Sequence, residues 1–326
     1  MTPNDRLDAG PRVPSAPRDS SEPVELEQRP PLRAIALLPS AATLGNLICG
    51  FIAVFLCMLE IRAAYSPMFP AQPRVLPHLQ AYVPSYIAYA AYLIIAAMIF
   101  DALDGRLARI ARRTSEFGAQ LDSIADIVSF GVAPVAMYLT VLLQRFAPAE
   151  ADPTVSAALW RVGLIGGLVY LSCAAIRLAR YNAENVRDES ATRKFSGLPT
   201  PGAAAGFTAL LLLHEQWVHD GGSFGGADAA AVLRWAIAPV AFGIGMLMVS
   251  RLDYVHVFNV YVRREHPPTH LVALVVLAIA TWYSPEIMLT LGAFAYIVSG
   301  MLLNLLRRKT SLRGGLPASA HVHHHN

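Results

Sequence analysis

Four aspartates lie close together in residues 100–131, within a chain that is otherwise strongly apolar. Asp101 and Asp104 are three residues apart, and Asp122 and Asp126 are four apart, so each pair would occupy one face of a helix. If the two helices fold back on each other at the turn between the pairs, the four carboxylates meet. Carboxylates clustered beside hydrocarbon repel one another and lose hydration unless they take up protons or bind cations. The spacing therefore predicts a site for divalent cations.

The residues around these aspartates indicate what such a site would bind. Mg²⁺ and Mn²⁺ are held in proteins by a few carboxylates, with substrate phosphates completing the shell, and paired ions can polarise a phosphoryl group. Gly105, Ala108 and Gly118 leave space beside the acids, although small residues also serve helix packing in membranes. Arg109 offers a planar fork suited to phosphate. A single aspartate at a helix end is usually only solvated, but the whole group at a membrane edge favours a function, with a diphosphate as the expected ligand.

The elements that must position these residues are membrane-spanning helices. The chain of 326 residues is 55% apolar and only 15% charged, whereas a soluble protein carries about a quarter charged residues. Its mean hydropathy is +0.43. About 20 consecutive apolar residues span a bilayer, and about eight such runs predict an all-α polytopic membrane protein. They cover 42–61, 86–107, 121–143, 158–180, 201–218, 230–250, 268–283 and 287–305, with a tight hairpin between the last two.

The basic residues predict how the helices are oriented. With eight spans, all but five of the 26 Lys and Arg residues fall on the side that holds both termini. The positive-inside rule then places both termini and the aspartates in the cytoplasm. The net charge of +3 therefore reflects topology and attraction to anionic lipids, and it gives no indication of nucleic-acid binding. The five exceptions are Arg62, Arg74, Arg145, Arg161 and Arg234.

The two ends of the chain differ from the apolar middle. Residues 1–33 are rich in proline and mixed charges without hydrophobic periodicity, a composition typical of a disordered tail, here on the cytoplasmic side. Residues 309–326 carry a histidine-rich end and are expected to form a flexible tail.

The aspartate stretch resembles the signature of the CDP-alcohol phosphotransferase family. The pattern D-x2-D-G-x2-A-R-x8-G-x3-D-x3-D is filled at every position by Asp101, Asp104, Gly105, Ala108, Arg109, Gly118, Asp122 and Asp126. Further segments resemble the bacterial phosphatidylserine synthase branch of this family, so the resemblance covers roughly residues 38–255. These segments are 38–54, 129–134, 177–182, 195–204 and 247–254.

The resemblance implies a reaction, a fold, an assembly and a set of metal ligands. It implies transfer of the phosphatidyl group of CDP-diacylglycerol to L-serine by direct attack, giving phosphatidylserine and CMP. It implies a six-helix membrane core over 34–255, working as a homodimer in a bacterial inner membrane, with two additional helices over 256–308. Two divalent cations, Mg²⁺ or Mn²⁺, would be held by the four aspartates. Asp126 would be both a metal ligand and the general base that takes the serine proton.

Two further pairs of residues are candidates for substrate contact. Arg177 and Arg180 share a helical face at the cytoplasmic end of the fourth run, where they could receive serine's carboxylate or a lipid phosphate, or serve only as a membrane anchor. Thr43 and Asn46 share a face of the first run. A buried Asn there needs a partner, which we expect to be a neighbouring helix or, with slight preference, the nucleotide.

Two alternative functions stay open on the sequence. The first keeps the chemistry but uses another acceptor, namely choline, glycerol phosphate or inositol phosphate. The second is a divalent-cation transporter, although such sites usually lie near the bilayer midplane on broken helices. An acyl hydrolase and a P-loop ATPase are disfavoured, because the sequence has neither a nucleophile elbow nor a Walker loop.

Overall fold

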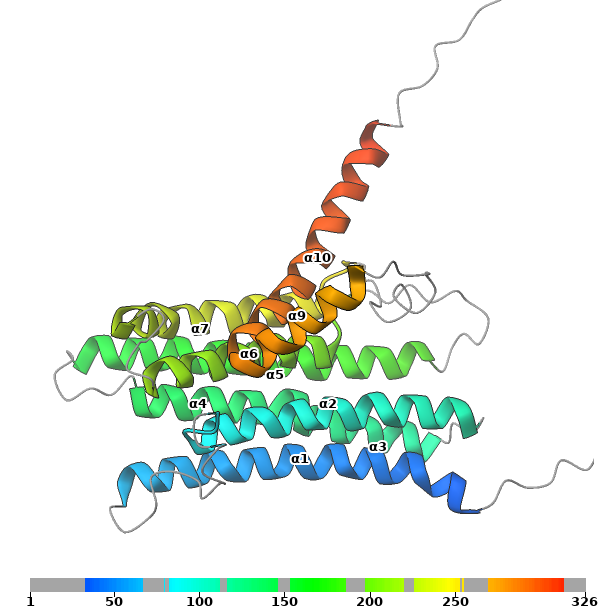
Figure 1. The fold of residues 1–326 in the computed structure, drawn as a ribbon, viewed down its shortest axis with the longest axis horizontal. Coiled ribbons are helices and arrows are strands. Elements are labelled where there is room, and N and C mark those ends of the chain that lie inside the picture. Colours follow the sequence, from blue (N-terminus) through cyan, green and yellow to red (C-terminus); the bar gives the residue numbers. More distant parts are fainter. Residues whose placement is uncertain are drawn as a thin grey trace, which may run out of the picture.

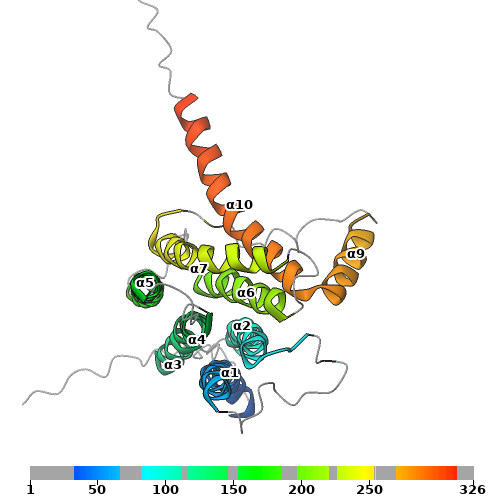
Figure 2. The same cartoon turned by 90° about the vertical axis from the view of Figure 1, so that its left-hand side faces the viewer.

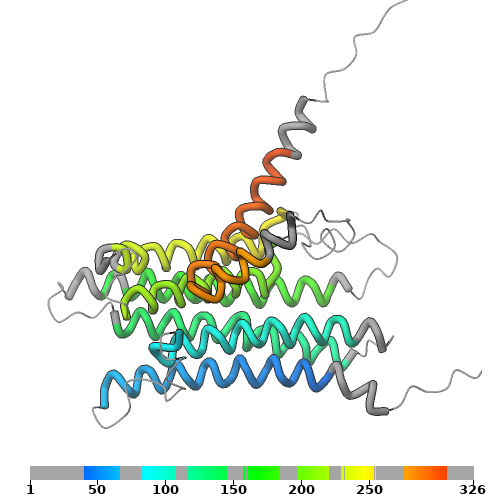
Figure 3. The backbone as a smooth tube through the Cα atoms, in the orientation of Figure 1, coloured from blue at the N-terminus to red at the C-terminus, as the bar shows by residue number. Residues whose placement is uncertain are grey.

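The computed structural model describes residues 33–66, 79, 82–111, 116–145, 153–185, 197–219, 226–252, 254 and 269–313. Within these residues the chain is helical and contains no strand, which confirms the predicted all-α class (Figure 1). The predicted tails fall largely outside them, at 1–32 and 314–326. Figure 3 traces the backbone as a tube in the orientation of Figure 1.

The helices coincide with the predicted apolar runs. The predicted hairpin is confirmed, since only Ser284 separates the last two helices. The third run is one continuous rod made of three consecutive elements. In chain order the elements are α1 Arg33–Tyr65, α2 Tyr86–Ala111, α3 Glu116–Asp126, η2 Ile127–Val132, α4 Ala133–Arg145, α5 Pro153–Asn185, α6 Thr200–His219, α7 Gly226–Val249, α9 Thr269–Tyr283 and α10 Pro285–Arg313.

The bundle consists of rods that lie side by side, namely α1, α2, the rod from α3 to α4, α5 and α7, and α6 lies between α2 and α7 (Figures 1 and 2). Every residue of α6 from Gly206 to Gln216 is buried, including His214 and Glu215, which are each 1% exposed. A helix covered by protein on all sides does not need an apolar surface for lipid. This explains how α6 can carry a histidine and a glutamate in mid-helix.

Six helices of the described part are long and apolar enough to cross a membrane by length and composition. The predicted runs of α6 and α9 do not meet that test. α6 is the buried central helix, and α9 has 15 residues, which is shorter than the roughly 20 that a perpendicular span requires. The described part of this multi-pass protein therefore contains six candidate spans, together with the buried α6 and the short α9, whose described side chains are mostly exposed.

The rod that carries the second aspartate pair is interrupted by a π-helical turn. Segment η2 begins directly after Asp126, and such wide turns occur often at functional sites. Pro134, just beyond it, has no amide hydrogen and cannot bond to the Phe130 carbonyl four residues earlier. The hydroxyl of Tyr170 on α5 donates to that carbonyl instead, at 2.9 Å. The irregular turn is thus stabilised from a neighbouring helix.

Helix α1 approaches this turn closely because it has a glycine there. A Cβ placed on Gly50 would lie 2.7 Å from the Cα of Ser129, closer than two carbon atoms can pack. The Ser129 hydroxyl donates to the backbone carbonyl of Asn46 at 2.9 Å, one turn earlier on α1. The polar groups of η2 therefore bond to α1, and α1 is fixed in register with the aspartates.

The C-terminal hairpin docks on α6 and then leaves the bundle. The first half of α10 packs on α6, where the Thr290 hydroxyl donates to the Ala209 carbonyl at 3.0 Å. Beyond it the side chains of α10 from Met301 to Leu303 are exposed, and the helix points away from the other rods (Figures 1 and 2). Near the turn between α9 and α10, the Trp282 carbonyl of α9 accepts a hydrogen bond from the Tyr82 hydroxyl at 3.2 Å.

Candidate functional site

The structure brings three of the four aspartates into one cluster. Asp101 on α2 and Asp122 and Asp126 on α3 each present an oxygen atom, and these atoms all lie within 4.8 Å of one another. Asp126 is 7% exposed, so the cluster extends from the edge of the bundle into its interior. The convergence expected from the spacing of the sequence is found for these three.

Asp104 flanks the cluster and is held from α1. It is buried, and its charge acts on both Asp101 and Asp122. The Thr43 hydroxyl donates a short hydrogen bond to its Oδ2 atom. The fourth predicted metal ligand is therefore beside the cluster, with one of its oxygen atoms already bonded to protein.

Asn46 holds Asp126 in the same way. Its Nδ2 donates to Asp126 Oδ1 at 3.0 Å, and the residue is fully buried. Within the described part of the chain, its Oδ1 atom has no hydrogen-bond partner. Thr43 and Asn46 were expected to contact a nucleotide or a neighbouring helix, and the structure places both against carboxylates. The sequence shows their shared face on α1, but only the fold reveals which acids they face.

The cluster fits a divalent cation. Two carboxylate charges within 4.8 Å of each other repel by at least about 3 kcal/mol when the effective dielectric constant is about 20. A doubly charged cation between them replaces that repulsion with attraction, and carboxylate oxygens are the hard ligands that Mg²⁺ and Mn²⁺ prefer. Three protein oxygens leave the rest of an octahedral shell to a substrate or water.

Space for a ligand lies beside the acids. A methyl group added to Gly105 would meet nothing within 4 Å, and this glycine is exposed next to the buried Asp104. Gly118 is half-buried on α3. The side chains of Ala108 and Arg109, both near the end of α2, lie outside the described residues.

An arginine on α5 faces the cluster. Arg177 interacts electrostatically with Asp126, and its Nη1 donates to the Thr200 hydroxyl at 2.9 Å. Among the residues that the structure describes, its buried Nε atom finds no hydrogen-bond partner. The half-buried Arg180, one turn further along α5, repels Arg177 by its charge. Of the two predicted arginines, the one beside the proposed base is Arg177.

The loop before α6 sets the position of Thr200. Gly197 has a φ of 93°, which favours glycine, and a Cβ there would lie 3.0 Å from the Ser250 carbonyl oxygen. The Gly197 amide donates to the Leu252 carbonyl at 2.8 Å, and the Leu198 amide donates to the Leu247 carbonyl at 3.0 Å. The loop is therefore clamped to the end of α7.

The end of α5 also holds α3, through a contact between residues 59 apart in the chain that local spacing could not predict. Asn182 Nδ2 donates to the Ser123 hydroxyl at 2.8 Å, and that hydroxyl donates to the Ala119 carbonyl at 3.0 Å. Ser123 is the neighbour of Asp122, so α5 fixes the rotation of the helix that carries two of the clustered acids.

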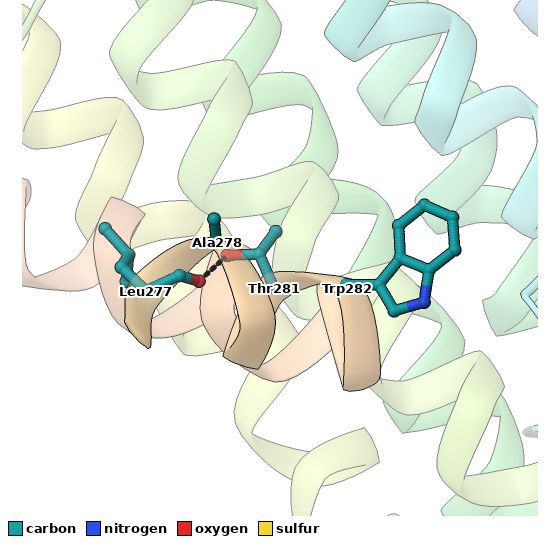
Figure 4. Close-up of a pocket in the computed structure, with 4 residues that line it drawn as sticks. All are labelled: Leu277, Ala278, Thr281 and Trp282. Atoms are coloured by element: carbon teal, nitrogen blue, oxygen red, sulfur yellow. Dashed lines mark hydrogen bonds between the residues drawn. The ribbon is translucent and has the colours of Figure 1, made fainter. Parts of the chain in front are cut away.

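A hollow on the hairpin belongs to a different part of the molecule. It is lined by four residues of α9 alone, and the Thr281 hydroxyl donates to the Leu277 carbonyl at 2.8 Å (Figure 4). None of the four is acidic or basic, so this hollow offers no chemistry comparable with that of the aspartates. The remaining lining residues are Ala278 and Trp282.

Comparison with known proteins identifies related chains. The model of the CDP-alcohol phosphatidyltransferase family matches residues 36–247. A Mycobacterium bovis protein named CDP-diacylglycerol–serine O-phosphatidyltransferase is 32% identical over 208 residues, which cover 63% of this chain and 65% of that relative. Proteins of the same name in Helicobacter pylori and Methanocaldococcus jannaschii are 28% and 40% identical, over 225 and 162 residues.

The extent of these matches differs among the relatives. The Helicobacter match covers 69% of this chain and 74% of the relative, and the Methanocaldococcus match covers 50% and 61%. The chain thus spans slightly less than two thirds of the length of the mycobacterial relative. No solved structure matches this chain.

Proposed function

This chain belongs to the CDP-alcohol phosphatidyltransferase family, and from that membership we propose that it transfers the phosphatidyl group of CDP-diacylglycerol to L-serine. The products are phosphatidylserine and CMP. The relatives named CDP-diacylglycerol–serine O-phosphatidyltransferase support this acceptor.

The observation that carries the proposal is the position of Arg177 beside Asp126. A guanidinium binds a carboxylate or a phosphate through paired hydrogen bonds, and Asp126 is the proposed base. The acceptor must therefore present an anionic group and a reactive hydroxyl a short distance apart. Serine does so, because only a short carbon link joins its hydroxyl to its carboxylate. Choline is a cation, and glycerol phosphate and inositol phosphate carry a larger and more highly charged group that would call for more basic residues than Arg177 and Arg180.

The four aspartates are assigned to the diphosphate end of the site. Asp101, Asp122 and Asp126 would hold two divalent cations, Mg²⁺ or Mn²⁺, with Asp104 as the fourth ligand. When bound, these cations would neutralise the diphosphate and stabilise the phosphate of the departing CMP. Gly105, Ala108 and Gly118 would admit the diphosphate to the helix surface, and Arg109 would bind it.

The protein's own groups would move one proton and orient the attack. Asp126 takes the proton of the serine hydroxyl as its oxygen forms a bond to the lipid-side phosphorus. The bond between that phosphorus and the bridging oxygen breaks, and CMP leaves with the electron pair. Arg177 holds the serine carboxylate, and Asn46 keeps Asp126 in place through the bond to its Oδ1. No covalent intermediate with the protein is involved.

The membrane placement follows from the end of the bundle where the cluster lies. α1 begins, α2 ends, α3 begins and α5 ends at the same end (Figure 1), and the basic residues concentrate there. We assign this end to the cytoplasmic face of a bacterial inner membrane. The catalytic core would be residues 34–255, assembled as a homodimer, with the helices of 256–308 added to it.

The test is an acceptor competition with the full chain. Purified protein in detergent would be incubated with CDP-diacylglycerol, Mg²⁺ or Mn²⁺, and one labelled acceptor at a time. We expect serine to give a labelled lipid and an equal amount of CMP, and chelation of the cations to abolish both. If another acceptor enters the lipid while serine does not, the assigned substrate is wrong.

A further inference from the structure

Two hydrogen bonds align α5 with the rod that carries Asp122 and Asp126. The Tyr170 hydroxyl donates to the Phe130 carbonyl at 2.9 Å, and Asn182 Nδ2 donates to the Ser123 hydroxyl at 2.8 Å. Residue numbers rise along α5 from the first bond to the second while they fall along the rod, so the two run antiparallel. The stretch of α5 between these bonds therefore faces residues 123–130 of the rod.

Arg177 and Asp126 both lie between the two bonds. Arg177 is seven residues after Tyr170 on α5, which is about two turns, so the two side chains share a face of the helix. Asp126 is four residues before Phe130, or about one turn along the rod. The guanidinium therefore leaves α5 at the level of the carboxylate that is proposed as the base.

The guanidinium of Arg177 is held on one edge by a threonine of α6. Its Nη1 donates to Thr200 Oγ1 at 2.9 Å, and Thr200 is fully buried. The Nε atom is also buried, and no described residue offers it a hydrogen bond. A carboxylate can bind to an arginine through Nε and the adjacent Nη2 together. The edge opposite the threonine is thus the one that suits an acceptor's carboxylate.

Thr200 can hold the arginine because its own backbone is fixed. Thr200 is the first residue of α6, and the carbonyl of Pro199 just before it accepts from the Ala203 amide at 2.9 Å. In the preceding loop, the amides of Gly197 and Leu198 bond to carbonyls near the end of α7. A branched side chain has few accessible rotamers, so this backbone sets the position of the hydroxyl.

We propose that Thr200 is a positioning residue of the acceptor pocket, which fixes the plane of the Arg177 guanidinium so that its Nε edge receives the carboxylate of the acceptor. This inference rests on the proposed function for the identity of the acceptor. A free arginine side chain has many rotamers to lose, and one that is held before the acceptor arrives binds it more tightly. Thr200 acts through Arg177 and has no part in proton transfer.

The test compares Thr200→Val and Thr200→Ser with wild type in the full chain. Valine keeps the branched shape and removes the hydroxyl, whereas serine keeps the hydroxyl. Because a hydrogen bond to a charged group is worth more than a neutral one, we expect KM for serine to rise about tenfold in Thr200→Val. The kcat and the KM for CDP-diacylglycerol should stay within about twofold, and Thr200→Ser should bind serine nearly as wild type does.

Thr208→Val is the matched control. Thr208 is buried on the same helix, and its hydroxyl has no hydrogen-bond partner within the described residues, so all three kinetic values should stay unchanged. Should valine at position 200 prevent folding, Thr200→Ala removes the same hydroxyl with a smaller side chain and is measured in its place.

A double-mutant cycle shows whether the effect passes through the arginine. Arg177→Lys alone should raise KM for serine, and adding Thr200→Val to it should have little further effect. The inference is overturned by an unchanged serine KM in Thr200→Val, by an equal rise in KM for both substrates, by an equal rise in Thr200→Ser, or by full additivity with Arg177→Lys.

The same measurements separate this inference from the proposed function. If wild type uses another anionic acceptor in place of serine, the proposed substrate fails, and the comparisons made with that acceptor still decide the role of Thr200. An acceptor without an anionic group would overturn both.

Discussion

Replacing Gly50 with alanine should separate α1 from the aspartates. The added Cβ would lie 2.7 Å from the Cα of Ser129, and a backbone atom cannot move aside as a flexible side chain can. Ordinary contact begins at 3.4 Å, so α1 must shift by about 0.7 Å relative to η2. The shift acts one turn from Asn46, whose Nδ2 bonds to Asp126 at 3.0 Å.

The expected loss follows from that displacement. The shift would lengthen the distance from Asn46 Nδ2 to Asp126 Oδ1 to about 3.7 Å, which is no longer a hydrogen bond. Asp126 would then lose its hydrogen bond to α1. Overpacking of this kind costs roughly 1–3 kcal/mol of stability. A misplacement of about 1 Å near a reacting group can lower turnover by about 10²-fold. We therefore expect Gly50→Ala to fold with lowered stability and to lose about 10²-fold in kcat.

The measurement is CMP release from CDP-diacylglycerol with saturating serine and Mg²⁺ or Mn²⁺, together with thermal unfolding in detergent. Gly243→Ala is the matched control, because a Cβ on Gly243 meets nothing within 4 Å and Gly243 is also inside a long helix. The control should be as active as wild type. If Gly50→Ala turns over at the wild-type rate, close approach of α1 is not what positions Asp126.

Three further changes test separate parts of the site. Asp126→Asn should lower CMP release by at least 10²-fold while the lipid nucleotide still binds, as measured by equilibrium binding; normal turnover would remove the base assignment. Tyr170→Phe leaves the Phe130 carbonyl without its donor and should cost about 1–3 kcal/mol in thermal unfolding; an unchanged midpoint would show that another group satisfies the carbonyl. Asn182→Ala breaks the 2.8 Å bond to Ser123 and should raise the cation concentration for half-maximal activity by about tenfold; an unchanged cation response would contradict this role.

The helices and the convergence of the acids could be predicted because both depend on local spacing. Apolar runs of membrane length and the spacing of three and four residues within each aspartate pair are properties of the sequence alone. They led to the cluster of Asp101, Asp122 and Asp126 that the structure contains. The distribution of arginines also predicts which end of the bundle faces the cytoplasm, and this orientation stays a prediction.

The hydrogen bonds from α1 to the aspartates could not be predicted, because each joins residues far apart in the chain. Thr43 and Asp104 are 61 residues apart, and Asn46 and Asp126 are 80 apart. Which acid each side chain meets depends on the rotation and depth of α1, and these are set by Gly50 against Ser129. The approach of α10 depends in the same way on Gly202 and Gly206 of α6, where an added Cβ would lie 2.8 Å from Tyr296 Cε1 and 2.6 Å from Ile297 Cδ1.

The cluster should make the protein less stable when no cation is bound, and this can be measured. Each pair of charges among Asp101, Asp122 and Asp126 lies within 4.8 Å and therefore repels by at least about 3 kcal/mol when the effective dielectric constant is about 20. Asp122→Asn removes one member from two such pairs, so without cations the variant should unfold at a higher temperature than wild type. Added Mg²⁺ should raise the midpoint of wild type by mass action and should have a smaller effect on the variant.

The assay is thermal unfolding in detergent with a chelator or with Mg²⁺, with Na⁺ at matched ionic strength as the control for screening. If the variant unfolds at a lower temperature than wild type in the chelator, Asp122 stabilises the fold through its protein partners. Repulsion among the carboxylates would then not lower the stability of the cation-free protein.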